Sequence, residues 1–322
     1  MRAIYDNTVI QIEVTNACHL SCRNCTRHVG HHRNPFFMDL GTIRNAILSL
    51  VDFPGRIGLM GGEPSMHPKF AEICAIYREM IPDKRRREFW SAGFHWVKYK
   101  NDIEATFDKD RISYNDHIAY DGKHQPLLVA IDEVIDDPEW RAELIDNCKF
   151  GNRWSASITP KGGFFCEIAA SADWLFDGPG GYPIEPGWWR KNDTQFADQV
   201  ERYCSKCSGA IPLPAFSDGR GGRDGPTVDL VSPGNLERLL AAGSPKVASG
   251  HYQVFDKKIT REDAAREKID GWNPTNYRSF HAHGPDDVDR NLGTTPKIGA
   301  PTAETIASRF KPAAIVQKEA AH

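Results

Sequence analysis

The sequence predicts an α/β protein: an incomplete parallel (β/α) barrel, then a small α+β domain and a partly irregular C-terminal extension. Strand-like apolar runs alternate with helical segments through the first half of the 322 residues, which is typical of repeated βαβ units. Polar and cysteine-rich segments follow several of these strands, at the edge where parallel α/β folds carry their active sites. We expect the three units at residues 1–147, 148–210 and 211–322.

Four strands are expected in the barrel unit. Residues 8–14 alternate between apolar and polar side chains, as a strand with two different faces does. Residues 57–60 form a short apolar run, which is typical of a strand buried on both faces. Two further strands fit residues 87–93 and 111–114.

Three helices are expected around these strands. Residues 39–51 and 69–81 place their apolar side chains at helical spacing, and a third helix fits residues 127–147. Because a helix follows each of the first two strands, the order of elements predicts strands that run parallel.

The second half of the chain predicts smaller elements. Two short strands flank a turn at residues 160–163, and a helix fits residues 167–176. A strand at 228–231 and helices at 234–242 and 259–269 follow, the last with Thr260 as N-cap and Asp263 three residues later. Residues 293–322 are expected to form a loosely held tail with one helical piece near 302–310.

The composition narrows the class of protein. Hydrophobic residues make up 40% of the chain, enough for a sizeable core, and the net charge of −3 argues against a general nucleic-acid or bilayer binder. No apolar run approaches the length of a membrane span and no secretory signal is visible, so we expect a cytoplasmic protein. In that compartment the eight cysteines favour metal binding over disulfides.

Three cysteines near the N-terminus carry the strongest chemical signal: Cys18, Cys22 and Cys25, in the spacing C-x3-C-x2-C. Three thiolates can hold three irons of a four-iron cluster and leave the fourth iron open to an outside molecule. The alternative is a zinc site closed by His19 or His28 as fourth ligand. The two hypotheses differ in whether the site is open or closed.

A second motif follows the strand at residues 57–60: Gly61, Gly62, Glu63 and Pro64. Glycine lets another group approach the backbone closely because it has no Cβ. Taken alone, the segment also fits an ordinary turn ahead of the next helix. Its position after a buried strand, and soon after the cysteines, favours a binding site.

Together the two motifs resemble the radical S-adenosylmethionine (SAM) family. The resemblance implies a [4Fe-4S] cluster on the three cysteines, whose open iron holds the amino and carboxylate groups of SAM, with the Gly-Gly-Glu-Pro segment binding the amino group. It extends loosely to three more cofactor positions, Ser91, Ser113 and Asn115, of which the last two also fit plain turn residues. One position departs from the pattern: Asn24 stands where many relatives have an aromatic residue near the adenine.

Four other cysteines form a second set: Cys148, Cys166, Cys204 and Cys207. Four cysteines can close a cluster completely. Their placement around a hairpin, a helix and a late C-x2-C resembles the twitch domain, the shortened form of the SPASM domain, which implies a second [4Fe-4S] cluster. A structural zinc ribbon with four cysteine ligands is the alternative. The remaining Cys74 is expected to be a small buried hydrophobe of the second helix.

The resemblance also implies an activity. SAM cleavage would give a 5′-deoxyadenosyl radical that takes hydrogen from a small polar substrate, with the electron supplied by an external donor such as flavodoxin or ferredoxin. The second cluster would accept the electron lost when a secondary alcohol of a carbohydrate or aminocyclitol becomes a ketone. The candidates for the base that takes the hydroxyl proton are His31, His32, Arg33 and Arg153.

Other functions stay open. The radical could instead serve epimerisation or peptide modification, although no cysteine after Cys207 is present to donate hydrogen in an epimerase and no peptide-binding segment is expected ahead of the first strand. A different class is a non-catalytic iron–sulfur or zinc-binding protein.

Three loops also have two interpretations each. Residues 26–33 fit a substrate-binding rim or a solvated basic loop. Trp188 and Trp189 fit a cover over the core or a stacking surface for a ligand. Residues 219–225 fit a connector or a phosphate contact.

Overall fold

The computed structural model describes residues 1–114, 123–153, 155–211, 213, 216–217, 227–266 and 278–279. Its central feature is a seven-stranded sheet with the order β11-β4-β3-β2-β1-β6-β7. The strands are β1 (Val9–Glu13), β2 (Arg56–Met60), β3 (Arg87–Ser91), β4 (Ile112–Tyr114), β6 (Ala156–Thr159), β7 (Gly162–Phe164) and β11 (Arg278–Ser279). The four strands expected in the barrel unit are all present, with ends that differ by one or two residues.

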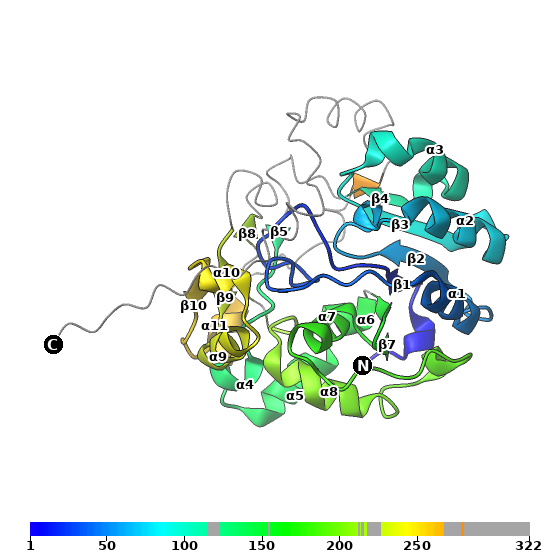
Figure 1. Cartoon of the computed structure of the whole chain (residues 1–322). Coiled ribbons are helices and arrows are strands. Elements are labelled where there is room, and N and C mark those ends of the chain that lie inside the picture. The colour runs from blue at the N-terminus through cyan, green and yellow to red at the C-terminus, as the bar shows by residue number, and fades with distance from the viewer. Residues whose placement is uncertain are drawn as a thin grey trace.

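The sheet is mostly parallel. Strand β1 lies near its centre, paired with β2 on one side and with β6 on the other, and β3 and β4 continue the parallel run. The edge strands β7 and β11 run antiparallel to their neighbours. The protein is therefore a mixed α/β protein, as expected, and the segment with the first three cysteines leaves the sheet from a central strand (Figure 1).

Three helices cover the outer face of the sheet: α1 (Leu40–Ser49), α2 (Phe70–Met80) and α3 (Trp96–Thr106). Figure 1 shows them along strands β1 to β4. Phe89 of β3 packs against Phe70 of α2 and against Phe107, with ring centroids 5.7 and 5.2 Å apart. Helices α1 and α2 confirm the expected segments, and the Asp39 side chain caps α1 by accepting from the Thr42 amide.

Helix α3 is not evident from the sequence pattern. Its buried residues Trp96, Tyr99 and Ile103 do fall at helical spacing. However, Val97 is 75% exposed, and charged residues interrupt the apolar stripe. One face of α3 is buried by contact with α2, although the sequence of α3 has no strong amphipathic pattern.

The prediction of a single helix over residues 127–147 is wrong. The structure has two helices there, α4 (Ile131–Val134) and α5 (Pro138–Asp146), after an extended stretch in which Leu128 bridges Val231. Pro138 has no amide hydrogen and cannot continue a preceding helix, but it is well suited to a first turn. The Asp137 side chain caps α5 by accepting from the backbone amides of Glu139 and Trp140.

The inner face of the sheet is polar. Because successive side chains of a strand point to opposite faces, Gln11 and Glu13 lie on the same side of β1, and both are buried. Ser157 of β6 donates a hydrogen bond to Glu13. The Gln11 side chain fills the space beside Gly58 of β2, where a Cβ atom would lie 1.9 Å from the Gln11 oxygen. This face, unlike the outer one, can therefore interact with polar molecules.

The expected hairpin around residues 160–163 is confirmed as β6 and β7. Its strand β6 joins the main sheet beside β1, so the hairpin is continuous with the barrel strands. The helices of this region are α6 (Lys149–Arg153), α7 (Glu167–Leu175) and α8 (Ala197–Tyr203), and α7 matches the expected segment at 167–176. Trp188 and Trp189 are buried, and their indole nitrogens donate to Ser49 of α1.

The C-terminal region adds small elements. They are β9 (Asp229–Val231), α9 (Pro233–Ala241), α10 (Pro245–Ala248), β10 (Tyr252–Val254) and α11 (Arg261–Arg266), while β5 (Lys123–His124) pairs with β8 (Phe216–Ser217). Thr260 and Asp263 cap α11 reciprocally, as expected. Two further expectations, the loop at 219–225 and the helical piece near 302–310, lie outside the described residues.

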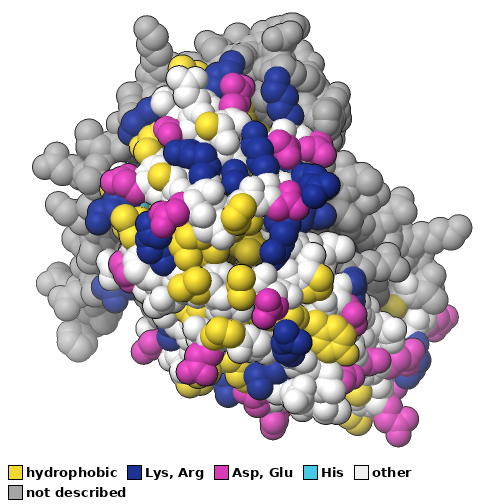
Figure 2. All heavy atoms as spheres, turned by 90° about the vertical axis from the view of Figure 1, so that its right-hand side faces the viewer, with side chains coloured by type: hydrophobic (Ala, Val, Ile, Leu, Met, Phe, Trp, Pro, Cys, Tyr) yellow, Lys and Arg dark blue, Asp and Glu magenta, His cyan; other side chains and the backbone are white. Residues whose placement is uncertain are grey.

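The surface over the outer helices mixes charges of both signs (Figure 2). Arg44 of α1 and Glu79 of α2, for example, form an ion pair at 2.7 Å. Within the described ranges, no helix is long and apolar enough to span a membrane.

Candidate functional site

The first three cysteines lie together at one pocket beyond the C-terminal ends of β1, β2 and β3. The pocket has an empty volume of about 570 Å³. Its lining comes from the cysteine loop after β1, from the segments that end β2 and β3, and from β5: Cys18, Leu20, Cys22, Cys25, Thr26, Arg27, Val29, Met60, Gly61, Gly62, Trp90, Ser91, Ala92 and His124. Segments far apart in the sequence thus meet at the edge where parallel sheets place their sites.

Gly61 and Gly62 let the end of β2 pack against the cysteine loop. A Cβ atom at Gly61 would lie 2.2 Å from the Thr15 carbonyl oxygen, and one at Gly62 would lie 2.5 Å from that of Ala17. The Gly62 amide donates to Thr15, and the Glu63 amide donates to Ala17. The group that approaches these glycines closely is therefore the protein's own backbone at Thr15 and Ala17. This contact fixes the cysteine loop above β2.

Glu63 holds the ends of two strands together. Its fully buried carboxylate accepts from the Ser65 amide and hydroxyl, from the Ser91 hydroxyl and, at 2.7 Å, from the Ala92 amide. Burial raises its pKa, against these hydrogen bonds. Glu63 and Pro64 do not line the pocket, so Glu63 acts on the pocket by positioning Ser91.

The loop holds its sulfurs in buried surroundings. The Leu20 amide donates to Cys18 Sγ and the Arg27 amide to Cys25 Sγ, both at 3.4 Å. Burial raises the pKa of the thiols of Cys18 and Cys25 above the ordinary value. Since metals bind the thiolate form, a positive ion is needed to offset that cost.

Asn24 fits the bend of the loop. Its φ angle is 53°, in the left-handed region that Asn adopts more readily than most residues. Its amide donates to Asp229 of β9 at 2.6 Å, and its side chain donates to the His124 carbonyl at 3.4 Å. The residue that departs from the family pattern thus shapes the loop and does not line the pocket.

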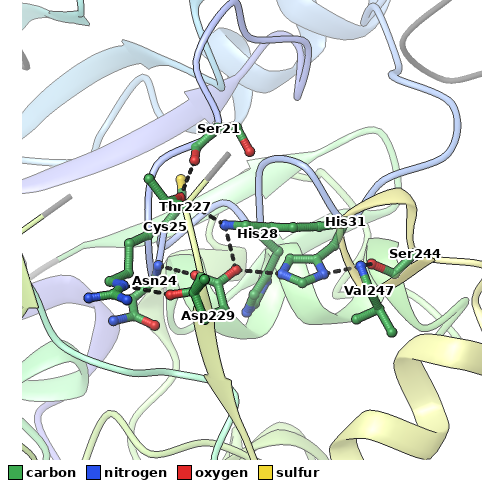
Figure 3. Close-up of polar contacts among 12 residues, drawn as sticks. Ser21, Asn24, Cys25, His28, His31, Thr227, Asp229, Ser244 and Val247 are labelled. Atoms are coloured by element: carbon green, nitrogen blue, oxygen red, sulfur yellow. Dashed lines mark hydrogen bonds and ion pairs between the residues drawn. The ribbon is translucent and has the colours of Figure 1, made fainter. Parts of the chain in front are cut away.

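His31 and His32 are buried and bonded to the protein. One ring nitrogen of His31 lies 2.7 Å from Asp229 and the other 2.8 Å from Ser244 (Figure 3). His32 hydrogen-bonds the Arg27 carbonyl, and burial lowers its pKa to about 4. Neither histidine lines the cysteine pocket. Of the expected rim at residues 26–33, only Thr26, Arg27 and Val29 contribute to that lining, and His28 lines the second cysteine pocket instead.

The other two candidate bases lie elsewhere. Arg33 is exposed, close to Gly243. Arg153 ends helix α6, and its side chain is outside the described atoms. As proton acceptors, all four candidates stay predictions.

The second set of cysteines lines a second pocket. Cys148, Cys166, Cys204 and Cys207 surround an empty volume of about 580 Å³, together with mainly apolar residues from α6, α7 and α8. Burial raises the pKa of all four thiols, and neighbouring cysteines of the set raise it further in each of the last three. Residues 148 to 207 are therefore folded so that the four cysteines line one pocket.

The remaining candidates are placed as follows. Cys74 is fully buried in α2, as expected, and burial raises its pKa to about 12. Ser113 lies on β4 opposite Trp90, while Asn115 lies outside the described residues. The part of the chain that the structure describes holds no group of three or more His, Cys, Asp or Glu side chains arranged around a single metal ion.

Five pocket residues are absent from the sequence-based candidates: Leu20, Met60, Trp90, Ala92 and His124. Met60 and Trp90 could have been found, because each lies at or near the end of a predicted strand, where the site was expected. His124 could not, because its place beside the loop depends on pairing between β5 and β8, which are far apart in the sequence.

Neither a protein-family model nor a curated protein matches the sequence. Among the solved structures that are similar, two are described. One is the crystal structure of BtrN in complex with AdoMet and 2-DOIA, 18% identical, with a TM-score of 0.40 over 62% of this chain and 87% of that one. The other is selenomethionine BtrN in an open conformation, 17% identical, with a TM-score of 0.38 over 64% of this chain and 90% of that one.

Proposed function

We propose that the protein is a radical SAM enzyme that oxidises a secondary alcohol of a small polar metabolite. One observation carries the proposal: seven of the eight cysteines sort into two pockets, three in one and four in the other, in the sets that the sequence predicts. The pocket with three cysteines also contains Gly61, Gly62 and Ser91, the positions at which the family motif places SAM.

The first pocket suits a [4Fe-4S] cluster with SAM. Cys18, Cys22 and Cys25 would bind three irons, and a cluster so held supplies the electron that cleaves SAM to methionine and a 5′-deoxyadenosyl radical. Gly61, Gly62 and Ser91 line the adjoining wall, where the family resemblance places SAM. Trp90 offers an aromatic face for the adenine in place of the aromatic residue that Asn24 replaces.

Part of the pocket wall is apolar and buried. Leu20, Cys22 and Ala92 form one buried apolar cluster with Cys18 and Cys25. A radical that abstracts hydrogen must meet its substrate before it meets solvent or other C–H bonds. The buried loop and the strand ends would hold substrate and cofactor in that confined space.

The second pocket suits a fully ligated cluster. Cys148, Cys166, Cys204 and Cys207 provide four sulfurs, so every iron would have a protein ligand. Such a centre suits electron transfer, and it would accept the electron left when the substrate alcohol becomes a ketone. A carbohydrate or aminocyclitol as substrate, and flavodoxin or ferredoxin as donor, are proposed from the family resemblance of the sequence.

One observation favours oxidation over thiol-dependent epimerisation. Among the eight cysteines, all of which are described, Cys74 is the one outside the two pockets, and it is fully buried in α2 on the outer layer. It cannot reach a substrate in the first pocket without unfolding of that helix.

Anaerobic reconstitution with iron and sulfide tests the proposal. We expect about eight irons per chain, the content of two four-iron clusters, and SAM-dependent formation of 5′-deoxyadenosine. Cys22→Ala should lose about half of the iron and all SAM cleavage. Cys74→Ala, a matched loss of a buried thiol, should keep both. Tight binding of zinc in place of iron, without SAM cleavage, would show a structural metal protein instead. SAM cleavage by Cys22→Ala at the wild-type rate would refute the role of the first three cysteines.

A further inference from the structure

His28 connects the first cysteine loop to the second cysteine pocket. Its backbone belongs to the loop, because its amide donates to the Cys25 carbonyl at 2.9 Å. Its side chain, however, lines the pocket that the four cysteines of the second set surround. The φ angle of His28 is 49°, in the left-handed region that histidine adopts more readily than most residues. The loop therefore holds an uncommon backbone conformation at the residue whose side chain reaches the second pocket.

Helix α7 fixes one edge of the His28 ring. Nδ1 lies 2.8 Å from the Ser171 hydroxyl oxygen, and His28 is 3% exposed. Nε2, on the other edge of the ring, makes no hydrogen bond with a described residue. Buried polar groups without partners are rare and call for an explanation. Because α7 begins directly after Cys166, Ser171 anchors the ring to the helix that follows one of the four cysteines.

Sulfur atoms in the second pocket would complete the hydrogen bonding of His28. The Ser171 hydroxyl can donate or accept, so it satisfies either tautomer of the ring. The sulfurs of an iron–sulfur cluster accept hydrogen bonds and donate none, so they would select the tautomer with its hydrogen on Nε2. The pocket already contains a contact of this kind, because the Gly209 amide donates to Cys207 Sγ at 3.2 Å.

The other polar side chains of the lining are less suited to such a contact. Tyr203 donates its hydroxyl hydrogen to Asp173. Lys206 is 41% exposed and forms an ion pair with Asp132, so solvent screens its charge. Arg238 is partly exposed and lies over an aromatic ring. The imidazole is buried, and a hydrogen bond has its largest electrostatic effect at low dielectric.

We propose that the His28 imidazole donates a hydrogen bond from Nε2 to a sulfur of the cluster held by the second cysteine set, and that this bond raises the cluster's reduction potential. The donor stabilises the reduced cluster more than the oxidised one, because the reduced cluster carries more negative charge. A higher potential favours acceptance of the electron that the substrate radical loses along with its hydroxyl proton. This inference rests on the proposed function. It assigns His28 to the second site, and not to a zinc site at the first three cysteines.

Redox titration of the anaerobically reconstituted full-length protein, followed by electron paramagnetic resonance, tests the inference. The signal that stays the same when SAM is added belongs to the second cluster, so its midpoint potential can be assigned. His28→Leu removes the donor. We expect reduction of the second cluster to become about tenfold less favourable, roughly the worth of one hydrogen bond to a charged group. For one electron, this factor lowers the midpoint by about 59 mV.

Two variants serve as references. In His28→Gln, the side-chain amide can donate from about the position of Nε2, so most of the wild-type potential should be recovered. Gln and Leu both lack the preference of His for the left-handed region, so the two variants share the same backbone cost. His67→Leu removes a buried histidine that bonds the Met38 carbonyl and lines neither cysteine pocket, and it should leave the midpoint unchanged.

The inference is overturned if His28→Leu titrates at the wild-type potential, or if His28→Gln shifts the potential as much as His28→Leu does. If His28→Leu takes up no second cluster, Ser171→Ala, which releases Nδ1, takes its place. Its midpoint should also fall, and an unchanged value would contradict the inference. Iron content, measured on the same samples, separates these results from failure of the proposed function, which wild-type protein without a second cluster would show.

Discussion

Single buried polar side chains decide the shape of the cysteine loop. Glu63 ties the ends of β2 and β3, Asn24 permits a left-handed bend, and His32 holds the Arg27 carbonyl. Each of these groups is buried and hydrogen-bonded, which is the condition under which a polar residue stabilises an interior. Removing one of them leaves its partner unsatisfied.

His32 gives the protein a measurable dependence on pH. Burial lowers its pKa from 6.5 to about 4, so between these values the unfolded chain binds a proton that the folded chain does not. The stability that neutral His32 contributes is therefore complete above about pH 6.5 and is lost as the pH falls toward 4. In His32→Gln, the slope of unfolding free energy against pH should decrease by about 1.4 kcal/mol per pH unit in this window.

Urea unfolding of wild type and His32→Gln at several pH values measures that slope. The His28 ring is present in both proteins, and its pKa is lowered mainly by burial. Identical slopes for the two proteins would show that His32 does not titrate in this window.

The sequence identifies these residues as candidates but does not assign their roles. His31 and His32 attract attention as bases because histidine titrates near neutral pH. Burial against Asp229, Ser244 and the Arg27 carbonyl could not be foreseen, because two of those partners lie about two hundred residues away in the chain.

At the scale of elements, the C-terminal strand β9 and helix α10 clamp the cysteine loop. Lys246 of α10 forms an ion pair with Asp229 of β9 at 2.7 Å and donates to the Cys22 carbonyl at 3.1 Å. Its amide donates to the Gly30 carbonyl, and the Thr227 hydroxyl donates to Ser21 (Figure 3). Two elements of the extension therefore hold both ends of the loop.

Lys246→Met should destabilise the protein by about 3–5 kcal/mol, because it removes the lysine charge that offsets the buried Asp229 carboxylate. Asp229 owes its low pKa, about 2, partly to Lys246 and to the hydrogen bond with His31, against the effect of burial. The control is Lys258→Met, which breaks an exposed ion pair with Asp136 and should cost less than about 1 kcal/mol. Urea unfolding of both variants measures the difference, and equal losses would refute the clamp.

Periodicity predicts those elements whose burial it reflects. Strands β1 to β4 and helices α1, α2 and α7 follow from apolar spacing, and the α11 cap follows from Thr260 and Asp263. The helix expected over residues 127–147 fails at Pro138, which separates α4 from α5. The pairing of β6 with β1 could not be predicted, because the two strands are far apart in the sequence and local spacing does not indicate which strands pair.

At the scale of the whole molecule, a buried charged cluster of Glu13, Arg27 and Glu167 lies beside both cysteine sets, because Arg27 follows Cys25 by two residues and Glu167 directly follows Cys166. The sequence sorts the cysteines into their sets, because spacing alone separates residues 18–25 from residues 148–207. It does not reveal the cluster, since Arg27 and Glu167 are 140 residues apart. The Arg27–Glu167 ion pair therefore links the two segments that carry the cysteine sets.

Cys166→Ala should separate the two steps of the proposed reaction. The variant keeps Cys18, Cys22 and Cys25, so it should still cleave SAM. Without its second electron acceptor, it should form no ketone. Mass spectrometry of candidate substrates, following deuterium into 5′-deoxyadenosine, identifies the substrate for this assay. Full product formation by Cys166→Ala would refute the role of the second site.

Electron paramagnetic resonance of the anaerobically reduced, reconstituted protein, before and after SAM is added, tests most directly whether one iron of the first cluster is open to SAM. If SAM binds one iron directly, the spectrum of the reduced first cluster should change when SAM is added to wild type or to Cys166→Ala. In Cys18→Ala, which lacks a ligand of the first cluster, this SAM-dependent change should be missing. A cluster spectrum that stays the same when SAM is added would mean that protein groups already occupy every iron, and the proposed enzyme would then lack its cofactor site.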